Sequence, residues 1–359
     1  MLNTVLIIKL WALGDILMAT PMLTALKNRY PGVRVTWIVD SVHGDLLQNH
    51  PLIDDLVVLD TGGWRRLLRK GNIWAWLSRT ADLRRQMQAR QFDAVINCHP
   101  DKWWTLALCA APIRVGLYPS VRSSVSRHFY TDALPLPQSP SCHNTDHYLI
   151  ATSALGCADS DKKMTLGQIP DESNVVQAFR QAHEIRSEEL MIVLAPFSTA
   201  ENRQWELERL AQVADWLRTA YEAQIVLPCG PGDVARAREI AALTRQTHIH
   251  LAESTTLRQY IGLLRSADLV ICGDSSPMHI AAAVGTPYVA LFGPTPLRER
   301  APLVGRGLPL AKSLFCAPCD QSTCRNPIFR ECMKLITVAD VQEAVTSLLK
   351  ETHEPSPLV

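Results

Sequence analysis

The apolar run Val5-Leu-Ile-Ile8, the turn Leu10-Trp-Ala-Leu-Gly-Asp15 and the periodic stretch Ile16 to Arg29 decide the fold. The first run has the continuous apolar character of a strand that is buried on both faces. After the turn, apolar residues recur at the spacing of one helix face. Strand, turn and helix in this order begin a βαβ unit, whose strands lie parallel in one sheet.

The same alternation of strands and helices continues along both halves of the chain. In the first half we expect strands over 33–39, 56–59 and 93–98 and a helix over 77–89. The second half restarts, with strands over 190–195, 224–227, 248–251, 268–272 and 288–292 and helices over 206–221, 234–244, 257–266 and 277–284. Capping-box pairs at Thr256 with Gln259 and at Thr337 with Asp340 mark two helix starts. The sequence therefore predicts an α/β protein with two Rossmann-like, doubly wound domains.

The alternation weakens between residues 135 and 168, where Pro, Ser, Asp and His are frequent. This stretch, with one helical patch near 146–155, predicts the approach to a domain boundary. We expect an N-terminal domain over 1–170, a second domain over 171–336, and a C-terminal helix and tail over 337–359 that packs back on the N-terminal domain. Doubly wound sheets bind ligands at the carboxyl ends of their strands. If the two sheets face each other, the ligand site is the cleft between them.

Composition places the chain among globular proteins. Of its 359 residues, 47% are hydrophobic and 20% are charged, which excludes disorder, collagen and coiled coil. No apolar run reaches the ~18 residues of a membrane span, and the first run lacks the basic start and cleavage site of a signal peptide. We therefore expect a cytoplasmic protein. Residues 1–170 hold 18 Lys and Arg against 13 Asp and Glu, so this half is expected to meet an anion.

The sharpest local pattern is Cys272-Gly-Asp-Ser-Ser-Pro-Met-His279, a strand end that runs into a helix. Ser276 suits the helix cap and Pro277 the first helical position, while Gly285 ends the helix. The amide groups over 275–278 would form a pocket for a phosphate, although an ordinary capped helix gives the same pattern. Asp274 could accept hydrogen bonds from sugar hydroxyls, and His279 could reach a bound phosphate or sugar; both residues also have common structural roles.

Three other turns carry polar residues after predicted strands. In 196–205, Ser198 and Thr199 offer hydroxyls and Arg203 offers a planar cation for a diphosphate. Trp205 anchors the next helix. In the turn 228–233, Asp233 suits either a ribose hydroxyl or a helix cap. In the first turn, Gly14 allows close backbone approach, and Asp15 could take a proton from an incoming hydroxyl or cap its helix.

Taken together, these turns resemble the bacterial lipopolysaccharide heptosyltransferases, glycosyltransferase family 9, which have the two-domain GT-B fold. The matching segments occur in family order and are 14–21, 114–116, 198–205, 230–233, 273–279 and 293–295. The resemblance implies inverting transfer of a heptose from ADP-L-glycero-D-manno-heptose to a hydroxyl of the lipopolysaccharide inner core. It implies no cofactor for catalysis.

The resemblance also assigns roles to single residues. Asp15 is the base, and Arg203 is the cation at a position that is often Lys in the family. Asp233 replaces the more usual Glu on the ribose. The diphosphate and the sugar are held by Asp274, Ser275, Ser276 and His279.

A basic stretch over 64–70 and 79–85, interleaved with Trp74 and Trp76, is the candidate contact for a phosphorylated acceptor and an anionic membrane surface. A solvated helix face is the alternative interpretation. The protein is then expected to associate peripherally with the cytoplasmic face of the inner membrane. Two other functions remain open, namely transfer to a protein or another glycan, and nucleotide-sugar binding without catalysis. No nucleic-acid partner is expected, because net charge is +1 and no recognition module is present.

Four of the ten cysteines, Cys316, Cys319, Cys324 and Cys332, fall within 17 residues. Four thiols suit a tetrahedral zinc or iron site, although the spacing is not that of a two-knuckle zinc ribbon. We consider a structural metal and free or disulfide-bonded thiols equally compatible with the sequence. The remaining cysteines are scattered and are expected to be small buried hydrophobes: Cys98, Cys109, Cys142, Cys157, Cys229 and Cys272.

Overall fold

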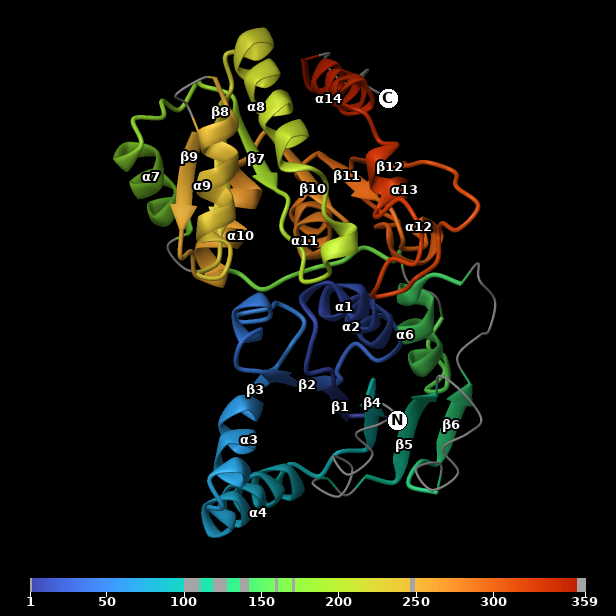
Figure 1. The fold of residues 1–359 in the computed structure, drawn as a ribbon. Helices are drawn as coiled ribbons and strands as arrows, with labels where there is room; N and C mark the ends of the chain where they lie inside the picture. The colour runs from blue at the N-terminus through green and yellow to red at the C-terminus, as the bar shows by residue number, and fades with distance from the viewer. Residues whose placement is uncertain are drawn as a thin grey trace. The chain divides into compact units, whose positions relative to one another are not determined.

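The structure is a computed structural model that describes residues 2–99, 109, 111–118, 128–135, 142–158, 161–169, 172–245 and 249–353. The chain forms two compact units, Met1–Gln168 and Ile169–Val359. Each unit contains one six-stranded sheet with helices packed around it (Figure 1). None of the helices in these described segments is long and apolar enough to span a membrane.

The first sheet has the strand order β3-β2-β1-β4-β5-β6, and every pair is parallel. The central strand, β1, is buried over almost its whole length, as its continuous apolar sequence predicts. We did not predict β5 and β6, whose ends lie close to residues outside the described segments. The strands are β1 (Thr4–Ile8), β2 (Arg34–Asp40), β3 (Asp55–Leu59), β4 (Ala94–Asn97), β5 (Ile113–Tyr118) and β6 (Asp132–Pro135).

The helix expected over 16–29 is two helices in the structure. The first ends at Ala19, and the second begins at Pro21, whose ring nitrogen has no hydrogen to donate to the preceding turn. The short helix before α4 was also not predicted. The helices of this unit are α1 (Leu13–Ala19), α2 (Pro21–Arg29), α3 (Thr61–Arg69), α4 (Ile73–Ala89) and α6 (Asn144–Ser153), with the 3-10 turn η1 at Gly44–Leu46.

The second sheet has the strand order β12-β11-β10-β7-β8-β9 and is also wholly parallel. Counted from the first strand of each unit, both sheets follow the Rossmann order 3-2-1-4-5-6, so the predicted fold class is confirmed. Residue 248, expected to begin a strand, lies outside the described residues. The strands are β7 (Met191–Ala195), β8 (Gln224–Cys229), β9 (Ile249–Glu253), β10 (Leu269–Gly273), β11 (Tyr288–Phe292) and β12 (Gly307–Ala311).

The helices of the second unit form two groups, one with α8, α9 and α14 and the other with α7, α10 and α11 (Figure 1). Both predicted capping boxes are present. We did not predict α7, α12 or α13. The helices are α7 (Glu172–Ala182), α8 (Leu207–Tyr221), α9 (Val234–Leu243), α10 (Leu257–Ser266), α11 (Ser276–Val284), α12 (Leu297–Arg300), α13 (Glu331–Lys334) and α14 (Val338–His353). The 3-10 turn η3 spans Glu201–Arg203.

The last helix, α14, belongs to the core of the second unit. Val341, Val345 and Leu348 are buried in one apolar cluster with Trp205 and residues of α8 and β11. This differs from the separate C-terminal segment that the sequence suggested. The reason is the apolar face of α14, which is buried against β11, β12 and α8.

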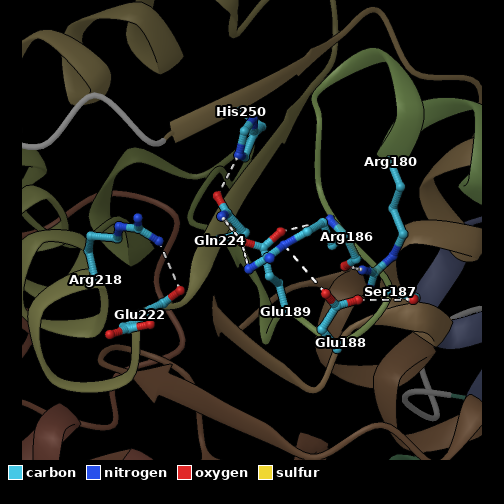
Figure 2. A network of polar contacts seen from close by, with 9 residues as sticks. All are labelled: Arg180, Arg186, Ser187, Glu188, Glu189, Arg218, Glu222, Gln224 and His250. Carbon is cyan, nitrogen blue, oxygen red and sulfur yellow. Dashed lines mark hydrogen bonds and ion pairs between the residues drawn. The ribbon is translucent and has the colours of Figure 1, made fainter.

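A polar network lies at the amino ends of β7, β8 and β9 (Figure 2). Glu189 accepts hydrogen bonds from the amide of Arg186 and from Gln224, and Gln224 Oε1 lies 2.9 Å from His250 Nε2. The Arg186 amide is the main cause that holds the pKa of Glu189 below its ordinary value. These groups hydrogen-bond to one another and connect the starts of the strands. Their role is structural, which leaves the opposite, carboxyl edge of the sheet for ligands.

Candidate active site

In the first unit, Asp15 lies in the first turn of α1, the helix that follows β1. Its Oδ2 is 3.3 Å from Nζ of Lys9, whose side chain is almost fully buried while that of Asp15 is 42% exposed. Nζ of Lys9 also lies 5.3 Å from the centre of the Tyr148 ring. Burial, and then the charge of Asp15, raise the pKa of the Tyr148 hydroxyl well above its usual value. The carboxylate thus faces solvent on one side and a fixed cation on the other.

The backbone that leads to Asp15 is held from the neighbouring strands. The amide of Leu10 donates to Nε2 of His99 at 2.8 Å, and the amide of His99 donates to Asn97 at 2.9 Å. Asn97 in turn donates to the hydroxyl of Tyr130 at 2.9 Å. The ring of Tyr130 lies against Gly116, where a Cβ atom would be 2.4 Å from a ring carbon. The expected motif 114–116 therefore contributes a close packing position in β5.

In the second unit, Arg203 and Asp274 meet at the carboxyl edge of the sheet. Arg203 is in η3, after β7, and Asp274 follows β10, the neighbour of β7. Nη1 of Arg203 is 3.3 Å from Oδ2 of Asp274, whose side chain is only 5% exposed. Nε of Arg203 is buried and has no hydrogen-bond partner among the described residues. The structure brings these two predicted residues together with unused donor capacity.

The start of α11 differs by one residue from the expectation. Ser275 is the N-cap, Ser276 is the first helical residue, and Pro277 follows it, so assigning the cap to Ser276 was wrong. Ser275 has an extended backbone with φ −159°, the conformation of a cap, and its hydroxyl makes no capping hydrogen bond. His279 is buried in the first turn. The predicted stop is confirmed, because Gly285 has φ 85° and its amide bonds to Ala281.

The other predicted residues lie in two turns joined by Arg236. Thr199 is exposed and Ser198 is half-buried. The hydroxyl of Ser198 accepts a hydrogen bond from the amide of Ala200. Asp233 is the N-cap of α9 without a capping hydrogen bond, and its carboxylate is 3.6 Å from Arg236. Arg236 also donates to Gln204 at 2.5 Å, which links this turn to the one that carries Arg203. Trp205 anchors its helix as predicted, since its Nε1 donates to Ile336 at 3.0 Å.

The four grouped cysteines line one cavity of about 260 Å³, together with Asn202 and Glu331. No disulfide bond joins any of them in the part of the chain that the structure describes. Burial raises the pKa of the Cys332 thiol, and the other three cysteines raise it further. In the segments that the structure describes, no three His, Cys, Asp or Glu side chains lie close enough together to hold a metal ion. Of the scattered cysteines, Cys142 is half-buried and the others are buried.

The basic stretch forms α3 and α4, which pack against each other. In α4, only Leu83 and Met87 are buried, and they join the core of the first unit. The start of α4 is open to solvent, with Trp74 84% exposed and Ile73 57% exposed. A surface that combines basic side chains with exposed apolar ones is available there.

Three residues with evident roles at these strand ends were not singled out from the sequence. Lys9 directly follows the buried strand β1, and a lysine at such a position is itself a signal. Asp320 lies near Arg203 and pairs with Arg300. Their partners come from separate loops, so no spacing in the sequence pairs them.

Comparison with known proteins identifies the family of this chain. The model of glycosyltransferase family 9 (heptosyltransferase) matches residues 80–329. The lipopolysaccharide core heptosyltransferase OpsX of Haemophilus influenzae is 25% identical over 290 residues, which cover 80% of this chain and 78% of OpsX.

Two solved structures share the fold. A glycosyltransferase family 9 protein of Veillonella parvula has a TM-score of 0.81 at 22% identity, with 97% of both chains covered. The Escherichia coli ADP-heptose lipopolysaccharide heptosyltransferase II has a TM-score of 0.74 at 19% identity, covering 98% of this chain and all of that one. These likenesses agree with the two Rossmann-like domains described above. The match to the family covers more than half of the chain, which therefore belongs to glycosyltransferase family 9 and is a glycosyltransferase.

Proposed function

We propose that this chain transfers a heptose from ADP-L-glycero-D-manno-heptose to a hydroxyl of the lipopolysaccharide inner core, with inversion at the anomeric carbon. Membership of the family supports heptosyl transfer. The relative OpsX is named for the lipopolysaccharide core, and the structurally similar E. coli enzyme is named for ADP-heptose.

The observation that carries the proposal is the pair of Arg203 and Asp274 at the carboxyl edge of the second sheet. A buried carboxylate holds the guanidinium in place, and the Nε of that guanidinium has no hydrogen-bond partner among the described residues. A guanidinium presents a planar fork of donors that matches phosphate oxygens. Next to this pair, α11 begins at Ser276, and the start of a helix favours negative charge.

In the proposed reaction, Asp15 takes the proton from the acceptor hydroxyl as its oxygen bonds to the anomeric carbon. The bond from that carbon to the diphosphate breaks, and the negative charge leaves on ADP. Arg203 and the start of α11 stabilise that charge, with Ser198, Thr199, Ser275, Asp274 and His279 as further contacts to the diphosphate and sugar. Asp233 is assigned to the ribose. These roles account for the proton and the charge with groups of the chain itself.

The first prediction concerns Asp15. We expect Asp15→Ala to lower kcat about 10²–10⁴-fold, since general-base help has that value, while the Kd for ADP stays within a factor of about two. Turnover is measured with ADP-heptose and a heptose-deficient core acceptor, and ADP binding by calorimetry. Asp161→Asn, which removes an exposed carboxylate from the same unit, is the control.

Unchanged turnover in Asp15→Ala would reject the assignment of the base. A wild-type protein that binds ADP-heptose yet transfers it to no acceptor would point to nucleotide-sugar binding without catalysis. Transfer of heptose to a protein or to another glycan, and not to the lipopolysaccharide core, would contradict the proposed acceptor. A panel of ADP- and UDP-sugars decides the donor.

The acceptor and membrane contact is assigned to the surface of α3 and α4. Lys70 and Arg79 are exposed, as is Trp74, and this combination suits an anionic, lipid-anchored acceptor at a cytoplasmic membrane surface. Sedimentation with anionic vesicles tests this proposal. Binding is expected to fall after Arg79→Glu and after Trp74→Ser, and binding that both variants retain would refute it.

A structural zinc or iron ion is proposed for the four grouped cysteines, as a support for their loop outside the chemical step. The support for it is the cavity that the four thiols share. Holding a tetrahedral ion requires the thiols to draw together. Elemental analysis of reduced protein purified without added metal tests it, and a metal content far below one ion per chain would refute it.

A further inference from the structure

Two arginines share one carboxylate beside the proposed donor site. Arg300 ends α12, after β11, and its Nη2 lies 3.0 and 2.9 Å from the two carboxylate oxygens of Asp320. Nη2 of Arg203 lies 4.0 Å from the same carboxylate, while Nη1 of Arg203 pairs with Asp274. Asp320 therefore connects the turn after β7 with the segment after β11.

Asp320 comes from the loop that also carries the four grouped cysteines. This loop is fastened at its backbone, because the amides of Cys319 and Asp320 both donate to the carbonyl of Pro294, at 2.9 and 2.7 Å. Asn202, the neighbour of Arg203, donates to the carbonyl of Gln321 at 2.7 Å. The position of the Asp320 backbone is thus set by bonds that do not involve its carboxylate.

The two acidic partners of Arg203 differ in burial. The Asp274 side chain is 5% exposed, whereas that of Asp320 is 42% exposed. Nε of Arg300, like Nε of Arg203, is buried and lacks a hydrogen-bond partner among the described residues. A guanidinium has five N–H groups, and one shared carboxylate does not satisfy two such groups. A diphosphate carries more charge and more acceptor oxygens than one carboxylate, and Asp320 can turn to solvent when it is replaced.

We propose that Asp320 is an internal counter-ion of Arg203 and Arg300 that the diphosphate of the donor displaces, and that Arg300 is a second diphosphate-binding residue. The proposal rests on the proposed function for its ligand, a nucleoside diphosphate. It assigns the cysteine-rich loop a place in donor binding, because that loop presents the competing carboxylate.

The decisive test is Asp320→Asn, with ADP binding measured by calorimetry. If the carboxylate competes with the ligand, its removal tightens ADP binding by about tenfold, the scale of one charge-assisted contact. A purely structural role predicts the opposite sign. Asn suits the site because residue 320 has φ 48°, a backbone conformation that Asn tolerates. The hydrogen bond from the amide of residue 320 to the carbonyl of Pro294 also remains possible in this variant. Unchanged or weaker binding would overturn the proposal.

Arg300→Gln tests the second arginine. We expect ADP to bind about tenfold more weakly, and the gain from Asp320→Asn to shrink in the double variant, because one competing pair is then gone. Arg298→Gln removes the same charge from an exposed position of the same helix and should leave ADP affinity unchanged. If Arg300→Gln and Arg298→Gln weaken ADP binding equally, the effect is one of overall charge, and the assignment of Arg300 to the diphosphate is refuted.

These outcomes separate the inference from the proposed function. If the wild-type chain binds neither ADP nor ADP-heptose, the proposed function fails. If it binds ADP and turns over ADP-heptose while the Asp320 and Arg300 variants behave as wild type, only the inference fails.

Discussion

Lys9 is the most unusual residue of the first unit, a lysine with a nearly buried side chain at the end of a central strand. Its ammonium is compensated by Asp15 at 3.3 Å and lies near the face of the Tyr148 ring. A buried ammonium is costly unless it is paired, so this arrangement fixes both partners. Lys9 therefore orients the Asp15 carboxylate, which is assigned as the base, and Lys9 itself does not have to contact substrate.

We predict that Lys9→Met lowers kcat about 10²-fold without changing the Kd for ADP, since a displaced carboxylate no longer meets the acceptor hydroxyl. Met has a similar length, and Asp15 is exposed enough to be solvated, so thermal unfolding should shift little. The matched control is Lys27→Met, which removes the cation of a partly exposed pair with Asp54 in the same unit. Full activity in Lys9→Met would show that the carboxylate needs no such support.

The sequence predicted single residues well where one turn contains the whole arrangement. Asp15, Trp205 and Gly285 stand where their local sequence placed them. Lys9 pairs with Asp15 in its own turn, and it was missed because its significance comes from its burial. Arg300 and Asp320 were missed because their significance depends on partners from other loops, and the ion pairs among Arg203, Asp274 and Asp320 join three separate turns. Local spacing carries no signal for such pairs.

At the scale of elements, the turn after η1 is fastened by His50. The amide of Leu52 donates to Nδ1 of His50 at 3.1 Å, and Nε2 lies 2.9 Å from the Thr165 hydroxyl. Nδ1 must therefore be unprotonated, so the ring is neutral with its hydrogen on Nε2. Burial lowers the pKa of His50 from 6.5 to about 4. A proton on Nδ1 would remove the bond from the Leu52 amide, so this turn is fastened by His50 in full only while the ring stays neutral.

The unfolded chain binds a proton at His50 near pH 6.5, and the folded chain does so only near pH 4. The stability from this group is thus fully present above pH 6.5 and is lost as the pH falls toward 4, by up to about 3 kcal/mol. Urea unfolding should show the free-energy gap between wild type and His50→Gln shrinking over this window. His128→Gln, which removes an exposed imidazole from the same unit, is the matched control.

Elements were predicted best where strands are central and apolar. The unpredicted strands are short or lie toward sheet edges: β12 is partly exposed and contains Pro309, and β6 has four residues. Among the helices, α3 begins with Gly62 and Gly63 close to its start, which weakens the helical signal. Asp60, whose side chain accepts from the amide of Gly63 at 2.6 Å, caps that start and stabilises the helix.

At the scale of the whole molecule, each unit has its own sheet and its own apolar core. A ligand that binds only the native second unit stabilises that unit by about 2.7 kcal/mol at a hundredfold excess over its Kd. We therefore predict that ADP slows hydrogen exchange in β7, β10 and β11 and leaves β2 and β3 unchanged. Mass spectrometry of peptic fragments measures this, and equal protection of β2 would contradict the assignment of ADP to the second unit.

The division into two doubly wound halves was predictable because the alternation of strands and helices stops near residue 135 and restarts before β7. The place of α14 was not, since its apolar face shows that it packs but not on which sheet. Only the long-range contacts with β11, β12 and α8 decide that.

The chain passes from the first unit to the second once, between Gln168 and Ile169, and does not return. A gene that encodes such a protein can exchange either half by a single recombination event at that joint. Under the proposed function, a lineage could in this way acquire a new acceptor half while it inherits an intact nucleotide-binding half, so that surface sugars diversify faster than the chemistry that attaches them.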